Sequence, residues 1–336
     1  MVPMPGAITR IASYLIAIAL LLLVLKLHLL PALLAGLLVY ALVESLAPTV
    51  QRLIPGTHAH WLIVALLSAV VVSLLTLAIL GSIAFLRSER GNPSLVFENM
   101  MPLIERARGQ LPQVVVDYLP DSIDDFRAGA IEWLREHAAQ LQVAGATAAR
   151  VVVHLLIGMV LGAMVALASA RPLRRDAPLV NELVTRSMHL VHSFHDIVFA
   201  QVKISAFNTL LTAIYLLIVL PLFHVELPLA KTLVIATFVV GLLPVVGNLV
   251  SNTLIFVMGL SVSLGVAVSA LVYLIVIHKF EYFLNARIVG TQIRARAWEL
   301  LIAMLFMEAA FGAAGLIAAP IYYAYLKREL AAAKLI

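Results

Sequence analysis

Residues 229–259 read LAKTLVIATFVVGLLPVVGNLVSNTLIFVMG, an apolar stretch that is interrupted near its middle by LPVVGN at residues 243–248. A second apolar stretch, residues 299–326, is interrupted in the same way by FGAAG at residues 311–315. Proline removes a backbone donor and glycine loosens the helix, so both places favour a reversal of the chain. We therefore expect two broken helices here rather than two continuous rods.

The composition of the chain indicates whether it folds in water or in a lipid bilayer. Of the 336 residues, 63% are hydrophobic and 12% are charged, against about half and about a quarter in a typical soluble domain. Lipid must therefore cover much of the surface. The basic excess, 23 Lys and Arg against 18 Asp and Glu, lies mainly beside apolar runs and indicates membrane topology, not a nucleic-acid partner. With no cysteine, disulfides, thiolate metal sites and cysteine nucleophiles are excluded.

A helix needs about 20 apolar residues to cross the hydrocarbon core. The continuous runs that predict such spans are residues 11–25, 29–47, 61–86, 151–170, 204–222 and 262–278. The first run is expected to be a membrane helix and not a signal peptide, because another apolar run follows it without a small-residue cleavage site. The sequence thus predicts an all-α, polytopic membrane protein.

Two topologies are open for the interrupted stretches. If both cross the bilayer, making eight spans, the connection that holds Lys279, Arg287, Arg294 and Arg296 lies outside, against the positive-inside rule. If both are re-entrant hairpins, this connection and both termini are cytoplasmic. The charges favour six spans plus two hairpins, which would enter from opposite sides and meet near mid-membrane. Broken helices at that depth must line protein or a wet cavity, and they indicate a transporter's binding site.

Three regions follow from this pattern: N-terminal spans over residues 1–86, a polar insertion over 87–150, and a transport core over 151–336. Within the insertion, apolar residues recur at helical spacing after Ser122, which predicts an amphipathic extramembrane helix. We expect it to lie along the membrane surface or against another subunit. A second amphipathic stretch, residues 177–203, is expected in the interface before the fifth span.

Four motifs occur in order along the second half: QVKIS at 201–205, LPVVGN at 243–248, EYFLNARIVG at 281–290 and FGAAGLIAAP at 311–320. With them the chain resembles the autoinducer-2 exporter family of bacterial membrane proteins. The resemblance implies a multi-pass protein of the bacterial inner membrane with eight hydrophobic segments, often a homo-oligomer, with pentamers described. It also implies export of the furanone autoinducer-2 or, in some members, exchange of sodium or lithium for protons.

The chain departs from the family pattern at three positions. Asn248 stands where proline commonly follows the Pro-x-x-Gly turn, Ala286 where proline precedes the arginine, and Glu308 where a small residue is common. These departures bear on the substrate more than on the fold.

Glu308 is the first candidate for function. It lies in an apolar half-helix one turn before the second break, and a carboxylate at such depth normally faces a cavity, a partner or a proton. The alternative is a structural carboxyl that hydrogen-bonds a neighbouring helix or subunit. We expect Glu308→Gln to leave folding intact and to abolish transport or its pH dependence.

The other candidates for the substrate pathway are polar or helix-breaking residues near the two interruptions: Pro244, Gly247, Asn248, Ser251, Asn252, Asn208, Gly312 and Gly315. Amides and hydroxyls on one helical face can bind a polar, uncharged solute, whereas a cation would use carbonyls freed around the proline. The same side chains could instead only satisfy the backbone of the turn or, for Asn208, link helices.

Glu281, Asn285 and Arg287 follow the sixth span and are candidates for a cytoplasmic latch, in which Arg287 pairs with Glu281 or Glu299. A simple interface anchor explains them equally well. The histidines at 189, 192 and 195 suggest a metal site, but their spacing turns them away from a common ion, so no metal is expected.

The leading hypothesis is a secondary transporter of a small polar solute, coupled to H⁺ or Na⁺ or uncoupled. The alternatives are a cation/proton antiporter and, outside transport, a scaffold protein whose insertion recruits a partner. The sequence contains no His-Glu-x-x-His helix, no paired nucleophile and base, and no nucleotide-binding loop. We therefore expect neither an enzyme nor a cofactor.

Overall fold

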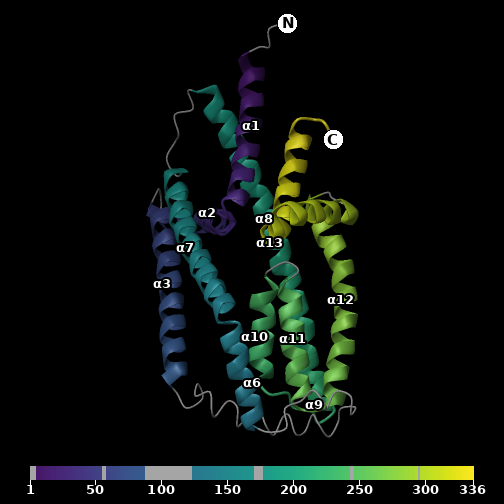
Figure 1. Cartoon of the computed structure of the whole chain (residues 1–336). Helices are drawn as coiled ribbons and strands as arrows, with labels where there is room; N and C mark the ends of the chain where they lie inside the picture. The colour runs from purple at the N-terminus through teal and green to yellow at the C-terminus, as the bar shows by residue number, and fades with distance from the viewer. Residues whose placement is uncertain (1–4, 55–57, 88–122, 170–176, 243–245, 294–295) are drawn as a thin grey trace. The chain divides into compact units, whose positions relative to one another are not determined.

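The computed structural model describes residues 5–54, 58–87, 123–169, 177–242, 246–293 and 296–336. Every regular element in these residues is a helix (Figure 1). The elements are α1 (Pro5–Lys26), α2 (Leu30–Gln51), α3 (His58–Arg87), α6 (Ile123–Glu136), α7 (Ala138–Ser169), α8 (Pro178–Ile214), η2 (Tyr215–Val219), α9 (Leu220–Leu222), α10 (Ala230–Gly241), α11 (Val246–Leu260), α12 (Leu264–Ile293) and α13 (Ala297–Ala332).

Among the described residues, six helical segments are long and apolar enough to cross a membrane: 8–26, 30–51, 58–77, 138–169, 178–222 and 298–332. Shorter apolar helices cover Ala230–Gly241, Val250–Leu260 and Leu264–Ile277. The predicted all-α, polytopic fold class is confirmed.

Several helices are longer than the apolar runs that predicted them. α7 begins at Ala138 and so carries part of the polar insertion into the fourth span. The stretch predicted as a separate interfacial helix, residues 177–203, is continuous with the fifth span in α8. The expected connection after the sixth span is likewise helical, because α12 runs on to Ile293. A helix needs no apolar surface to continue, so the end of an apolar run does not mark the end of the helix.

The chain forms two compact units: Met1–Leu74, Ala144–Val198 and Val289–Ile336 make unit 1, and Leu75–Val143 with Phe199–Ile288 make unit 2. In unit 2, α10 and α11 lie side by side as a helical hairpin whose connection is residues 242–245 (Figure 1). Thus the first interrupted stretch reverses, as its LPVVGN sequence predicts.

The core of unit 2 lies where this hairpin meets α12 and the π-helical turn η2. Tyr215 of η2 stacks on Tyr273 of α12 with 4.0 Å between ring centroids, and its hydroxyl is 2.9 Å from Ser269 Oγ. Tyr273 donates to the Leu211 carbonyl at 2.7 Å, just before α8 passes into the π-helix. A π-turn disturbs the regular hydrogen-bond ladder, so a donor from another helix stabilises this place. Leu216 is buried in the same core.

In unit 1, α2 packs closely on α7 through glycines. A Cβ on Gly158 would lie 2.6 Å from the Ala32 Cα, and one on Gly162 would lie 2.7 Å from the Gly36 Cα. Small residues four apart on a membrane helix allow backbones to approach in this way. The apolar core around this contact includes Val43 and residues of α3 and α8.

We expect Gly158→Ala to destabilise unit 1 by about 1–3 kcal/mol, because the methyl group would overlap backbone atoms that cannot move aside. The matched control is Gly145→Ala in the same helix, where an added Cβ meets no atom within 4 Å. This control should be neutral or stabilising by up to about 1 kcal/mol, since alanine favours helix. Thermal unfolding in detergent checks both variants, and equal midpoints would contradict the close contact.

Candidate functional site

The tip of the α10–α11 hairpin is closely packed. Gly241 ends α10 and Gly247 lies in the first turn of α11, and both are buried. A Cβ on Gly247 would fall 2.8 Å from the Gly241 Cα. The glycine at 247 is therefore required for the two arms to approach.

A polar face of α8 satisfies the carbonyl end of α10. Gln201 donates from Nε2 to the Gly241 carbonyl at 2.8 Å, and Ser205 donates from Oγ to the Phe238 carbonyl at 2.7 Å. The last carbonyls of a helix have no partner within it, and in lipid each must find one. The face continues along α8 with Asn208 and Thr212, which are both buried. The QVKIS motif thus holds the hairpin tip in place.

The structure places only some of the predicted pathway residues. Ser251 is buried in α11, and Asn252 beside it is half-buried. Pro244 lies outside the described residues. The backbone of Asn248 belongs to α11, but its side chain lies outside the described part.

The three proposed latch residues, Glu281, Asn285 and Arg287, lie within α12, and their side chains are likewise outside the described part. Glu299, the alternative partner of Arg287, contacts other groups: Tyr323 donates to its Oε2 at 2.5 Å, and the Lys327 Nζ is 2.6 Å from the same oxygen. The latch stays a prediction, with Glu281 as its expected acceptor.

These Glu299 contacts prove that α13 is folded back on itself. In a straight helix the 28 steps from Glu299 to Lys327 would separate the two residues by about 42 Å. The reversal occurs at Gly312, whose φ of 61° and ψ of −146° lie outside the helical region. At Gly315 an added Cβ would fall on the carbonyl of Met307, so the arms touch close to the bend. The second interrupted stretch is therefore also a helical hairpin.

Glu308 lies on the first arm of α13, one turn before the bend. Its side chain is exposed in the structure, and no hydrogen bond or ion pair joins it to another described residue. The flanking Leu305 and Phe306 are also exposed. The carboxylate is thus on an apolar outer surface of the hairpin rather than in dry packing.

Sequence reasoning missed a buried ionic cluster between α8 and α13. Arg186 and Glu329 form an ion pair, with side chains only 6% and 5% exposed. Arg186 also binds Glu182 at 2.7 Å and covers the Tyr14 ring at 4.1 Å. His189 Nδ1 lies 3.1 Å from the Glu329 carboxylate. The signal in the sequence was two opposite charges, one in the amphipathic stretch 177–203 and one just beyond the apolar stretch 299–326, but nothing there paired them.

The three histidines of α8 have separate contacts. His189 faces Glu329, whereas His192 Nδ1 lies 2.7 Å from the Met188 carbonyl oxygen. His195 lies beside Asp196, which also binds Arg328 at 2.6 Å. Among the described residues no group of three metal-ligating side chains comes together.

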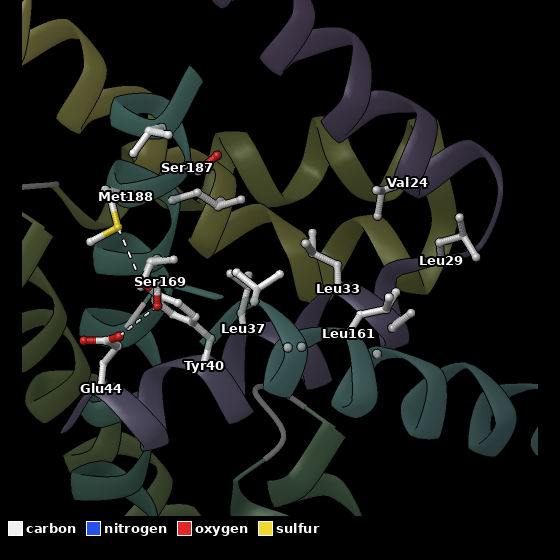
Figure 2. Close-up of a pocket in the computed structure, with 18 residues that line it drawn as sticks. Val24, Leu29, Leu33, Leu37, Tyr40, Glu44, Leu161, Ser169, Ser187 and Met188 are labelled. Carbon is white, nitrogen blue, oxygen red and sulfur yellow. Dashed lines mark hydrogen bonds between the residues drawn. The ribbon is translucent and has the colours of Figure 1, made fainter. Parts of the chain in front are cut away.

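Unit 1 contains a pocket of about 1020 Å³ that is formed by α2, α7 and α8, with Val24 of α1 at one end. Figure 2 shows leucines around Val24 at that end and polar side chains at the other. At the polar end, Ser169 donates to Glu44 at 3.3 Å, and Tyr40 contacts the Met188 sulfur at 3.8 Å (Figure 2).

The fold and these sites define a polytopic α-helical membrane protein with two broken helical hairpins, an arrangement typical of transporters. The sequence profile of the AI-2E family transporter matches residues 11–334. The chain belongs to this family, and it is a membrane transporter. Comparison with curated proteins and with solved structures gave no match.

Proposed function

We propose that the chain is a secondary transporter that exports a small polar solute, similar to autoinducer-2, across the bacterial inner membrane. The observation that carries the proposal is the exposed Glu308 carboxylate beside the Gly312 bend, in an arm that is otherwise apolar. An ionised group in this setting needs a proton, a cation or a wet cavity. We propose that Glu308 binds the coupling H⁺ or Na⁺.

The solute site in this proposal is the tip of the α10–α11 hairpin. The buried polar groups of α8 and α11, such as Asn208 and Ser251, supply neutral donors and acceptors there. Neutral groups suit an uncharged, hydroxyl-rich solute, because they bind it through several hydrogen bonds without the desolvation cost of an ion pair. Glu281, Asn285 and Arg287 would close the cytoplasmic side.

The specific alternative is a Na⁺(Li⁺)/H⁺ antiporter, which the same carboxylate favours. The two activities differ in what crosses the membrane. In liposomes, an antiporter changes internal pH when sodium is added and no organic solute is present, whereas a solute exporter does so only with its solute.

We expect Glu308→Gln to reduce coupled flux by about tenfold, which corresponds to about 1.4 kcal/mol, and to remove its dependence on pH. The amide keeps the size of the side chain but cannot take up a proton. Flux is measured with purified protein in liposomes under imposed proton and sodium gradients.

The control is Glu132→Gln, at a side chain of α6 that is 63% exposed and forms a surface pair with Arg135. This variant should transport like the parent protein. Full, pH-dependent flux by Glu308→Gln would remove the residue from the coupling mechanism.

The family resemblance supports two further parts of the proposal. We propose a homo-oligomer, with the pentamer as the expected form, and cytoplasmic N- and C-termini. Native mass spectrometry of the detergent-solubilised protein measures the first. Because the chain contains no cysteine, single cysteines introduced near each terminus can report the second by labelling in intact cells.

A further inference from the structure

The pocket of unit 1 has a pronounced separation of apolar and polar ends. Val24, Leu29, Leu33 and Leu161 surround one end, and Tyr40, Glu44, Ser169 and Ser187 lie toward the other (Figure 2). Along α2 the lining runs from Leu29 to Glu44, a rise of about 22 Å for an ideal helix. One leaflet of the hydrocarbon core is about 15 Å thick, half of about 30 Å. The pocket is thus long enough for an acyl chain with its headgroup.

The middle of the pocket offers an apolar slot where a chain can lie. Gly36, Gly158 and Gly162 border this part, where the backbones of α2 and α7 are in close contact. Beside them stand aliphatic side chains of α2 and α7 that are not fully buried, including Leu33 and Leu161. Contact with a flexible hydrocarbon chain buries this apolar surface, which is favourable in free energy.

The polar end carries the carboxylate of Glu44, which is not in an ion pair with any residue that the structure describes. Glu44 accepts a hydrogen bond from Ser169, and no cationic side chain among the described residues forms an ion pair with it. Tyr40 and Ser187 add only neutral hydroxyl groups. A carboxylate in a membrane helix is costly unless it is paired, so the missing partner should be a cation that can also donate hydrogen bonds.

The polar end also lies at the level of a headgroup. In the sequence, Arg52 follows Glu44 by eight positions and Arg171 follows Ser169 by two. Both arginines belong to the set that the positive-inside rule assigns to the cytoplasmic face. The carboxylate therefore lies near the cytoplasmic boundary of the hydrocarbon core.

We propose that this pocket binds a phospholipid with a primary ammonium headgroup, of the phosphatidylethanolamine type, from the cytoplasmic leaflet. The acyl chain lies in the apolar slot, along the aliphatic side chains of α2 and α7 that line the pocket. The ammonium group donates to Glu44. The hydroxyls of Tyr40, Ser169 and Ser187 lie at the same end of the pocket and bind the phosphate oxygens. None of the residues that line the pocket is among those proposed for the transport path, so the assignment does not depend on the identity of the solute.

The test is native mass spectrometry of the whole protein in detergent, titrated with phosphatidylethanolamine, phosphatidylcholine and phosphatidylglycerol of the same acyl chains. We expect phosphatidylethanolamine to bind about tenfold more tightly than either of the others, because only its headgroup has N–H donors on a cation. Equal binding of the three lipids would overturn the proposal.

Two variants probe the two ends of the pocket. Glu44→Gln should remove the preference for phosphatidylethanolamine, whereas Glu226→Gln, at an exposed carboxyl of the connection before α10, should keep it. Leu161→Trp fills the slot and should weaken the binding of all three lipids to the same extent. A preference that survives Glu44→Gln, or lipid binding that is unaffected by Leu161→Trp, would contradict the assignment.

A water-soluble amine could also bind a carboxylate. Glycerophosphoethanolamine, which has the headgroup without acyl chains, is therefore added as a competitor at millimolar concentration. The lipid site predicts no displacement, since most of the contact is with the chains. Displacement at concentrations comparable with those of the lipid would show a site for a free amine solute and would overturn the lipid proposal.

Discussion

Arg186→Met should lower the free energy of unfolding by about 3–5 kcal/mol, the range found when one partner of a buried ion pair is removed. The reason lies with Glu329, whose side chain is 5% exposed and whose carboxylate binds Arg186. Without the guanidinium, this charge stays buried beside His189 and the Tyr325 hydroxyl. Thermal or denaturant unfolding in detergent, followed by circular dichroism, measures the loss.

A double variant separates the stability loss caused by the buried, unpaired charge from the loss caused by changed packing. Arg186→Met with Glu329→Gln removes both charges and should recover most of the stability, because replacing a buried ion pair by neutral groups is often tolerated. The matched control is Arg135→Met, which breaks a pair that is 75% and 63% exposed and should cost less than about 1 kcal/mol. Equal losses for Arg186→Met and Arg135→Met would refute the role of the cluster.

Gly312→Val should open the bend of α13 and abolish transport. The φ of 61° and ψ of −146° at this position belong to a region that only glycine enters without strain, and other residues there cost about 1–3 kcal/mol. A β-branched side chain is among the least tolerant. The arms would relax toward a continuous helix, which removes the broken backbone that the transport proposal requires.

The bend can be measured directly because the native chain contains no cysteine. Spin labels on cysteines at Leu300 and Ala324, which lie in one apolar cluster, should report a short distance in the parent protein. A straight helix would separate these positions by about 36 Å. Ala310→Val, in the same arm but at an ordinary helical position, is the control and should keep the short distance. A short distance together with full flux in Gly312→Val would disprove the requirement for glycine.

The two hairpins could be predicted from the sequence because each depends on a local signal. Pro244 with Gly247, and Gly312 with Gly315, interrupt apolar stretches that are otherwise uniform, and the structure folds the chain back at both places. Whether both arms of each hairpin return to the same side of the bilayer stays a prediction from the basic residues. So does the meeting of the two tips, which belong to different units.

The pairing of distant residues could not be predicted. Arg186 and Glu329 are 143 positions apart, and each by itself is typical of a charge near the membrane interface. The pocket was missed for a similar reason, since its slot combines Gly36 with glycines of α7. Helical periodicity indicates which face of a helix is apolar, but it does not say which neighbour that face meets.

The π-helical turn Tyr215–Val219 changes the direction in which side chains point at the end of the continuous helix that begins with α8. Before it, Gln201 and Ser205 are directed at the carbonyls of α10, whereas Leu216 within it and Leu220 directly after it enter the core beside α12. Each residue of an α-helix advances the phase by about 100°, so the wider turn changes the angle at which the last turn of the helix, Leu220–Leu222, is presented. Excising a single residue there would leave length and hydropathy almost unchanged and would still turn Leu220 away from this core.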